Sequence, residues 1–284
     1  MISFSAIFFS LSDASPLTGT FFRGLYALPV LAIIWWVGRR HDERSNRARL
    51  LALAAGFALG LDVIAWHTAI EHIGAGLATL IANSQVIFVS ITAWIFLDER
   101  PARKVLAAIP VILSGVALVS GIGQEDAFGS DPLLGAALAL LAAVFYSGFI
   151  LGFRQANTAK APGAGPLMEA TLGLVLITPI VGLIGNGIDY TPVWPSHGWL
   201  LALALSSQVV GWMLIGYALP RLPAAETATI ILLQPALTLI WGAVILGERP
   251  SVLQLVGAGI VLGGVGFVAL ARSRRSEREQ MATA

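Results

Sequence analysis

The sequence predicts an all-α polytopic membrane protein with about ten transmembrane helices, arranged as two inverted five-helix repeats. Three observations predict this fold. Apolar residues make up 57% of the 284 residues and charged residues only 12%, about half of the ~25% usual in soluble domains. The apolar residues are gathered into long segments, and one short phrase recurs at about half the chain length. Because so few polar residues cannot cover a globule in water, we assign the chain to a lipid bilayer.

Nine segments are long and apolar enough to cross a membrane, for which a helix needs ~20 residues. They lie at residues 17–37, 50–70, 74–97, 105–123, 132–153, 166–185, 198–219, 225–246 and 252–271. Residues 1–12 are also apolar but cover only part of a span, and Asp13, Pro16 and Arg23 separate them from the next segment. We therefore expect a tenth helix at the start of the chain, shortened at Met1.

The repeated phrase is Leu97–Pro101 (LDERP) and Leu246–Pro250 (LGERP), 149 positions apart. Further identities at the same offset are Gln85 with Gln234, Leu113 with Leu262, Gly115 with Gly264, and Val119 with Val268. If the phrase follows the fourth helix of each copy, each copy has five helices, and this odd number turns the second copy upside down. The predicted organisation is a first repeat at 1–123, an outer linker at 124–131, an inverted second repeat at 132–271 and a cytoplasmic tail at 272–284.

The Glu-Arg-Pro step within the phrase is interpreted as structural. A proline at the first helical position and an acidic residue beside a helix start both stabilise the N-terminus of the helix that follows. We expect the phrase to mark the two repeats rather than to take part in binding.

The basic residues predict the orientation of the chain. Of the 17 lysines and arginines, all but Arg23 and Arg249 fall on one side of the ten-helix arrangement. The other side carries the acidic loop Gln124–Asp126. We therefore expect both termini in the cytoplasm.

The helix pattern and its Glu-Arg-Pro steps, together with Phe21–Leu28 (FFRGLYAL) and Gln234–Leu237 (QPAL), resemble the drug/metabolite transporter superfamily. Within it the chain is similar to EamA-type ten-helix exporters, and in detail to bacterial aromatic amino-acid exporters through Trp66 and His67. The resemblance covers essentially the whole chain. It implies an exporter in the bacterial cytoplasmic (inner) membrane, with a central cavity lined chiefly by the first, third, fourth, sixth, eighth and ninth helices.

Polar side chains deep in a bilayer are costly and are therefore candidates for function. Asn83 and Gln85 fall near the middle of the fourth helix, and Gln234 falls near the middle of the ninth, where Pro235 predicts a kink. A symmetric pair of glutamines at the midplane is the pattern of a binding site between inverted repeats. The alternative is that both glutamines hydrogen-bond neighbouring helices as packing contacts.

The third helix carries Asp62, Trp66 and His67. Asp62 and Trp66 are four residues apart and share a face, whereas His67 is rotated further by about a quarter turn. Asp62 and His67 are candidates to bind a substrate ammonium group or to relay a proton, and a buried structural pair is the alternative. The residue equivalent to Asp62 in the second repeat is Gly211, so this charge has no symmetric mate.

An aromatic pocket is predicted from Trp66, Tyr146 and Trp212. It would stack a planar side chain or hold an ammonium group by cation–π contact, with packing in the core or against lipid as the alternative. Gln208 shares a helix face with Trp212. The predicted substrate-binding residues are Trp66, His67, Asn83, Gln85, Tyr146, Gln208, Trp212 and Gln234.

Packing contacts are predicted from three glycine pairs, Gly56–Gly60, Gly148–Gly152 and Gly259–Gly263, which are spaced for close helix approach. Glu169 is expected to pair with Arg154 or Lys160 near the cytoplasmic end.

Other function classes find little support. The spacing His67-x3-Glu71-His72 matches neither His-Glu-x2-His nor His-x2-Glu-His, so no metal site is predicted. The chain has no cysteine, no Gly-x-Ser-x-Gly and no Gly-x4-Gly-Lys, so we predict no enzyme, no catalytic residue, no cofactor and no nucleotide-driven step. The expected partners are a small-molecule substrate and the lipid bilayer, without nucleic acid, and the expected state is a monomer or weak homodimer.

The predicted function is export of small metabolites by alternating access at a midplane site. Amino acids with aromatic or other apolar side chains are the favoured substrates. A passive facilitator or channel, and a drug or nucleoside exporter, are the alternatives.

Overall fold

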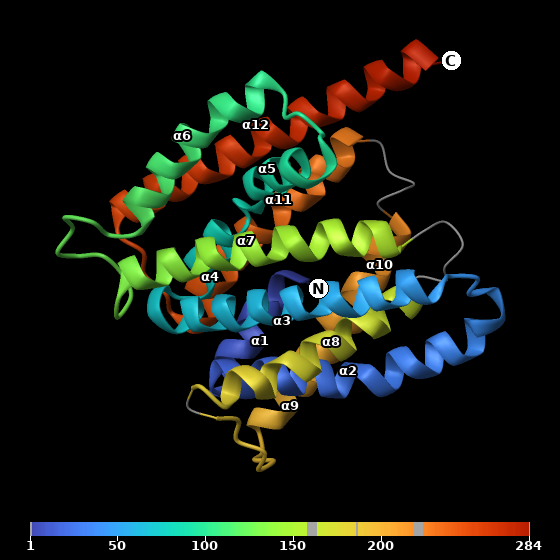
Figure 1. Cartoon of the computed structure of the whole chain (residues 1–284). Helices are drawn as coiled ribbons and strands as arrows, with labels where there is room; N and C mark the ends of the chain where they lie inside the picture. The colour runs from blue at the N-terminus through green and yellow to red at the C-terminus, as the bar shows by residue number, and fades with distance from the viewer. Residues whose placement is uncertain (1, 158–163, 186, 219–223, 284) are drawn as a thin grey trace.

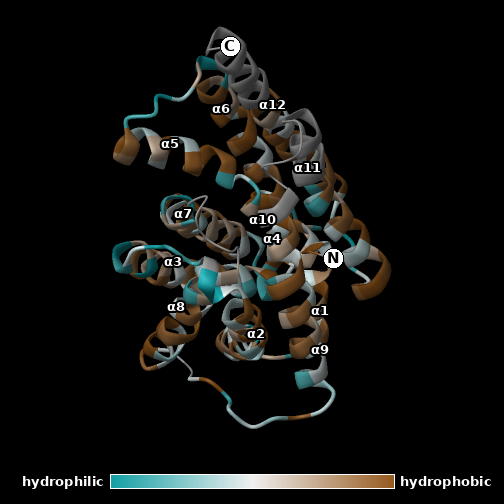
Figure 2. Cartoon of the chain, turned by 90° about the vertical axis from the view of Figure 1, so that its right-hand side faces the viewer, coloured by the Kyte–Doolittle hydropathy of each residue, from teal (hydrophilic) through white to brown (hydrophobic). Residues whose placement is uncertain are grey.

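The computed structural model is all-helical in the part of the chain that it describes (Figure 1). It describes the backbone of residues 2–157, 164–185, 187–218 and 224–283, and the side chains of these residues apart from 41, 216–232 and 271–283. Seven helices of this part are long and apolar enough to cross a membrane, and two shorter apolar helices span Ile2–Ser12 and Leu233–Leu246. Hydrophobic residues make up most of the surface of helices such as α2 (Pro16–Gly38), α6 (Arg103–Val119) and α8 (Ala164–Gly182) (Figure 2). The predicted all-α polytopic fold is confirmed.

The first half of the chain begins with a short helical segment and continues with long helices. Its elements are η1 (Ile2–Phe4), α1 (Ser5–Ser12), α2 (Pro16–Gly38), η2 (Arg39–His41), α3 (Asn46–Ile73), α4 (Ala75–Ala82), α5 (Gln85–Leu97) and α6 (Arg103–Val119). Serines cap two of these helices: Ser15 accepts a hydrogen bond from the Thr18 N–H (3.3 Å), and Ser45 accepts one from the Ala48 N–H (3.2 Å). Such side-chain acceptors satisfy N–H groups that have no partner within the helix.

The second half contains the remaining helices. They are α7 (Pro132–Ala156), α8 (Ala164–Gly182), α9 (Ser196–Leu203), the π-helical η3 (Ala204–Gly211), α10 (Trp212–Ala218), α11 (Ala224–Trp241), the π-helical η4 (Gly242–Leu246) and α12 (Val252–Thr283). The backbone of α12 continues as a helix into the predicted tail, whose side chains lie outside the described residues.

The repeated phrase has the same local structure in both halves. Asp98 follows α5 with a φ of 54°, and its equivalent Gly247 follows η4 with a φ of 69°. The next N–H then bonds back into the preceding helix, from Glu99 to the Ala93 carbonyl (3.3 Å) and from Glu248 to the Gly242 carbonyl (3.1 Å). Asp98 and Gly247 differ in residue type but both have a positive φ, so the phrase is a helix-ending motif that occurs twice.

Glycines lie at the closest contacts between helices, but not every predicted glycine pair makes such a contact. A Cβ on Gly56 would collide with the Ala170 carbonyl, so α3 and α8 touch through backbone at that point. The prediction for Gly259–Gly263 is wrong for the part of the chain that the structure describes, because a Cβ on either glycine would meet no atom of that part within 4 Å. The residue of α12 that approaches α6 is Gly257, whose added Cβ would lie 2.6 Å from the Gly115 carbonyl oxygen. Figures 1 and 2 both show α6 and α12 running side by side at one edge of the bundle.

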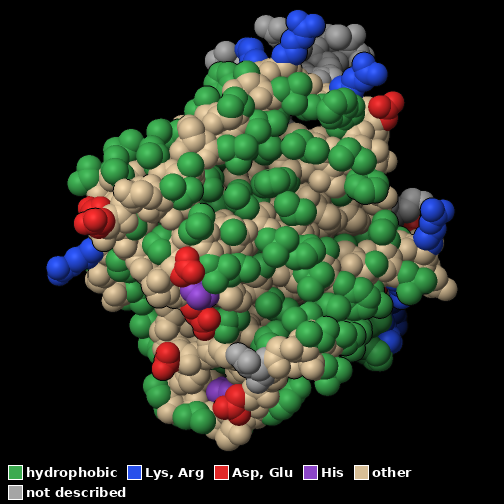
Figure 3. Space-filling view, turned by 60° about the vertical axis from the view of Figure 1, so that its left-hand side comes forward, with side chains coloured by type: hydrophobic (Ala, Val, Ile, Leu, Met, Phe, Trp, Pro, Cys, Tyr) green, Lys and Arg blue, Asp and Glu red, His purple; other side chains and the backbone are tan. Residues whose placement is uncertain are grey.

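The helix connections gather at two opposite ends of the bundle (Figure 1). The basic end holds the α2–α3 and α5–α6 connections and the end of α7, with most of the described arginines. The acidic end holds the α6–α7 and α8–α9 connections and the start of α4, and Figure 3 shows acidic and histidine side chains there amid hydrophobic surface. Lys160, Arg221 and the side chains of the predicted tail lie outside the described residues.

Candidate functional site

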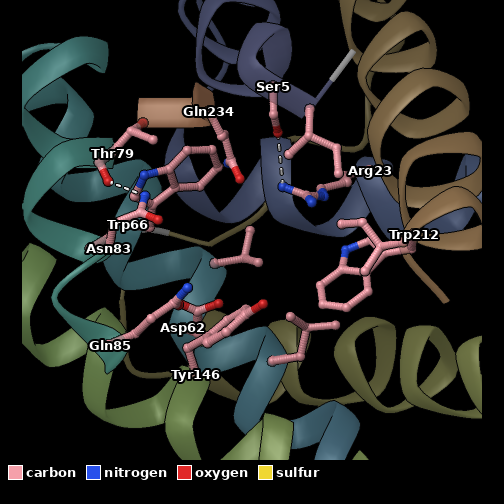
Figure 4. A pocket seen from close by; sticks show the side chains of 15 residues that line it. Ser5, Arg23, Asp62, Trp66, Thr79, Asn83, Gln85, Tyr146, Trp212 and Gln234 are labelled. Atoms are coloured by element: carbon pink, nitrogen blue, oxygen red, sulfur yellow. Dashed lines mark hydrogen bonds between the residues drawn. The ribbon is translucent and has the colours of Figure 1, made fainter. Parts of the chain in front are cut away.

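A cavity of about 110 Å³ lies in the middle of the bundle (Figure 4). Residues from both halves of the chain line it. They are Ile2, Ser5, Arg23, Leu59, Asp62, Val63, Trp66, Thr79, Ala82, Asn83, Gln85, Tyr146, Trp212, Ile215 and Gln234. One buried water occupies roughly 10–15 Å³ of such cavity volume. The space therefore corresponds to roughly seven to eleven waters, which suits a small organic molecule.

An interrupted helix places polar groups in the cavity wall. The predicted segment 74–97 is divided at Asn83 and Ser84 into α4 and α5. The Asn83 side chain donates from Nδ2 to the Thr79 carbonyl (2.8 Å), a bond that competes with the backbone pattern of a helix. The interruption brings Thr79, Asn83 and Gln85 to the cavity. The equivalent α11 continues through Pro235 from Ala224 to Trp241, so the break lies in the first half.

Arg23 is the cation of the cavity. It lies in α2, is only 6% exposed, and is held by two contacts: Nε donates to Gln208 Oε1 (3.0 Å) and Nη1 donates to Ser5 Oγ (3.4 Å). Gln208 in turn donates from Nε2 to Thr171 Oγ1 (3.0 Å). The π-helical η3 carries Gln208, and such wide turns are frequent at functional sites. Gln208, which does not line the cavity itself, therefore holds the Arg23 guanidinium in place.

Asp62 is the acidic residue of the cavity. It lies on α3, one turn before Trp66, and both side chains face the cavity. Asp62 is 8% exposed, and no described residue donates a hydrogen bond to its carboxylate or forms an ion pair with it within 4.0 Å. Figure 4 shows Arg23 and Asp62 on opposite sides of the cavity.

An aromatic wall completes the site. The rings of Tyr146 and Trp212 lie 6.3 Å apart between centroids, and Phe149 packs edge-on behind Trp212 at 5.3 Å. This wall joins α7 to α10. Trp66 faces the cavity from another side (Figure 4).

Most of the predicted site residues are brought together. Those that line the cavity are Asp62, Trp66, Asn83, Gln85, Tyr146, Trp212 and Gln234. Gln208 reaches the cavity only through Arg23. His67 does not line it: the ring is fully buried, stacks on Phe9 at 3.7 Å and lies 3.0 Å from Thr20 Oγ1 through Nδ1. The extra rotation of one residue along α3 turns His67 from the cavity to α1 and α2.

Arg23 is the residue that the sequence reasoning missed. The topology prediction counts Arg23 as a charge toward the outer end, but the side chain is buried in the cavity. A signal was present, because Arg23 is the only charged residue between Pro16 and Gly38, and a charge within a membrane helix indicates function.

A carboxylate at the acidic end connects the two halves of the chain. Glu248 accepts hydrogen bonds from the backbone N–H groups of Ala75 (2.5 Å) and Gly76 (3.0 Å), the first residues of α4. Burial raises the pKa of Glu248, and the two N–H groups act in the opposite direction. The prediction that this acid stabilises the helix following its own phrase is corrected: it caps a helix of the other half.

The equivalent carboxylate is differently placed. Glu99 lies at the basic end, where its Oε1 pairs with Arg154 Nη2 at 3.0 Å and the two side chains are 48% and 62% exposed. At the repeat offset, the counterparts of Ala75 and Gly76 are Ala224 and Ala225, the first residues of α11. The two glutamates thus hold equivalent sequence positions in unequal environments.

A cluster of ion pairs around Arg44 lies at the basic end. Arg44 pairs with Asp42 (2.9 Å) and with Glu169 (2.6 Å). Of the predicted partners of Glu169, Arg154 pairs with Glu99 instead, and Lys160 lies outside the described residues. Trp35 Nε1 also donates to Asp42 (3.0 Å). Hydrogen bonds from Arg44 hold the pKa of Asp42 well below its usual range. The described residues contain no group of three His, Asp or Glu side chains placed to hold a metal ion.

Comparisons with known proteins agree with this architecture. A model of the EamA-like transporter family matches residues 1–121 and again residues 133–270. A probable terminal-alkyne amino-acid exporter of Streptantibioticus cattleyicolor is 26% identical over 78% of this chain and 74% of its own length. The threonine/homoserine exporter RhtA of Escherichia coli K12 is 26% identical over 77% of this chain and 70% of its own length. One solved structure has a TM-score of 0.65 at 16% identity, covering 96% of this chain and 94% of that chain, a likeness that shows the fold.

Proposed function

The chain belongs to the EamA-like transporter family, and we propose that it exports amino acids across the bacterial inner membrane by alternating access at the central cavity. The resemblance seen in the sequence extends to relatives that are amino-acid exporters. The proposed orientation places the basic end in the cytoplasm, following the distribution of lysine and arginine.

The observation that carries the proposal is the charge content of the cavity. A buried guanidinium and a buried carboxyl group face one small space whose other walls carry apolar, aromatic, hydroxyl and amide side chains. Charged side chains inside a membrane protein are costly and commonly mark a substrate or ion pathway. An amino acid carries both complementary charges and has a size that suits about 110 Å³ of space.

Aromatic and other apolar side chains are the favoured cargo. The wall formed by Tyr146 and Trp212 offers flat apolar surface next to Ile215. Such rings stack on planar groups and pack against aliphatic ones. The relatives named for threonine and homoserine and for a terminal-alkyne amino acid argue for including small polar and small apolar amino acids in any test.

Alternating access is supported by the two equivalent glutamates. We infer that residues 1–123 and 132–271 act as inverted repeats, which exchange roles between two conformations. In the conformation described here, Glu248 caps α4 and links the halves at the acidic end. In the exchanged conformation, Glu99 would leave Arg154 and cap the start of α11 at Ala224 and Ala225, closing the basic end.

Flux into proteoliposomes tests the proposed function. The purified chain is reconstituted, and uptake of labelled amino acids, nucleosides, drugs and sugars is measured with and without a pH gradient. We expect saturable transport of amino acids, with Trp66→Ala and Gln85→Ala reducing flux without loss of folded protein. Transport of nucleosides or drugs in place of amino acids would favour that alternative, and flux that does not saturate would favour a passive facilitator.

A further inference from the structure

We infer that the site recognises its substrate by the free α-carboxylate and the free α-ammonium group, with Arg23 binding the former and Asp62 the latter. This inference rests on the proposed function and deepens it. It assigns a role to Arg23 and makes both charged groups of the amino acid necessary for binding.

The first step concerns the guanidinium. Two of its three nitrogens are held, Nε by Gln208 and Nη1 by Ser5, and no described residue accepts a hydrogen bond from Nη2. The contact with Gln208 fixes the plane of the guanidinium, because Gln208 is itself anchored on Thr171. A guanidinium fixed in this way and facing a cavity suits a carboxylate, to which its N–H groups donate strong charge-assisted bonds.

The second step concerns the carboxylate across the cavity. Asp62 has no hydrogen-bond donor and no cation within 4.0 Å among the described residues, although it is only 8% exposed. A buried charge without a partner is strongly unfavourable. A substrate ammonium would supply the missing partner, and Tyr146, which lines the cavity beside Asp62 (Figure 4), would add its aromatic face.

The third step is that the two charges are kept apart. Arg23 and Asp62 face one cavity but do not form an ion pair within 4.0 Å of each other. If they served only to neutralise one another, direct contact would be the favourable arrangement, because a buried pair needs close geometry to offset the loss of hydration. A gap between fixed opposite charges suits a ligand that carries both charges on neighbouring atoms, as an amino acid does.

Arg23 and Asp62 have no charged equivalents in the second half of the chain. The equivalent of Asp62 is Gly211 and the equivalent of Arg23 is Leu172, so the second half has no counterpart of either charge. The glutamines Gln85 and Gln234 occur in both halves and both line the cavity. Charges present in one half alone fit a site that orients an asymmetric substrate.

The experiment compares three ligands that carry the same side chain but differ in their α-carboxylate and α-ammonium groups. In proteoliposomes holding the full chain, uptake of a labelled amino acid is competed by the unlabelled amino acid, by the amine that lacks its carboxylate, and by the carboxylic acid that lacks its amino group. We expect both analogues to compete at least roughly 100-fold more weakly, because each leaves a buried charge of the site unpaired. Equal competition by either analogue would overturn the inference while leaving amino-acid transport intact. If no amino acid is transported, the proposed function itself fails.

Variants assign the two charges individually. With Arg23→Gln the amino acid should lose its advantage over the amine, and with Asp62→Asn it should lose its advantage over the carboxylic acid. Arg47→Gln and Asp126→Asn remove exposed charges of the same kind and should retain both preferences. If Arg23→Gln or Asp62→Asn does not fold, Arg23→Lys and Asp62→Glu replace them, and the analogue series with the unaltered chain still decides. Unchanged discrimination in folded Arg23 and Asp62 variants would refute the assignment.

Discussion

Replacing Glu248 by glutamine should destabilise the protein far more than the same change at Glu99. The two residues hold equivalent places in the repeat, so the substitutions are chemically matched. Glu248 is 7% exposed and accepts from two backbone N–H groups at the start of α4. Glu99 makes one ion pair in which both side chains are about half exposed.

The magnitudes follow from these environments. A glutamine at 248 offers one acceptor oxygen and turns its NH2 group toward the second N–H, which leaves a buried donor unsatisfied at a cost of about 2 kcal/mol. At roughly 2–4 °C per kcal/mol for a large chain, the melting temperature should fall by roughly 4–8 °C. An exposed ion pair contributes at most about 1 kcal/mol, so Glu99→Gln should change the melting temperature by less than roughly 4 °C.

Thermal unfolding in detergent, followed by size-exclusion chromatography of the heated protein, measures both values. Equal destabilisation by the two variants would refute the reasoning about the cap. Transport adds a second reading: if the glutamates exchange roles, Glu99→Gln should slow flux although the resting fold is unaffected. Full flux in Glu99→Gln would show that α11 needs no such cap.

Further expectations concern the basic end and the helix contacts. Arg44→Gln removes the cation that Glu169 contacts and leaves Asp42, among the described residues, with only its longer ion pair to Arg49 (3.7 Å), so it should cost about 3 kcal/mol of unfolding free energy. Arg47→Gln, at an exposed position, should be near neutral in the same thermal assay, and similar losses in the two variants would contradict the role given to Arg44. Arg44 lowers the pKa of Asp42. The stability gained from this carboxylate should therefore be complete above the ordinary aspartate pKa of roughly 4 and should diminish as the pH falls toward the lowered pKa. The melting temperatures of the unaltered chain and of Asp42→Asn should then converge in acid. Gly257→Val should lower the yield of folded protein by pushing α12 off α6. Gly259→Val should not, because a Cβ at Gly259 has no atom of the described residues within 4 Å, and equal yields would argue against the helix contact at Gly257.

Sequence alone predicted the helices and much of the cavity, for identifiable reasons. Length and hydropathy determine membrane helices, and the repeat offset located Gln85 and Gln234 at equal depth. Helical periodicity then placed Asp62 and Trp66 on one face. The same geometry explains why His67, one residue further, turns into the packing of α1 and α2.

Features that depend on contacts between distant parts of the chain could not be predicted from the sequence patterns. Arg23 was counted with the charges that set topology, because a charge count does not show that Gln208 and Ser5 hold the side chain inward. Glycine spacing does not say which helix face meets a neighbour, so Gly259 and Gly263 were chosen where Gly257 makes the contact. The cap of α4 by Glu248 joins residues more than half the chain apart.

Counterflow in proteoliposomes tests the central claim most directly. Vesicles holding the purified chain are loaded with an unlabelled amino acid and diluted into a trace of the same labelled compound. Alternating access at one cavity predicts a transient rise of labelled amino acid inside the vesicles above its equilibrium level, and a smaller rise with Asp62→Asn. Labelled compound that only approaches equilibrium, with no rise above it, would contradict a carrier and show that the cavity is part of a passive path.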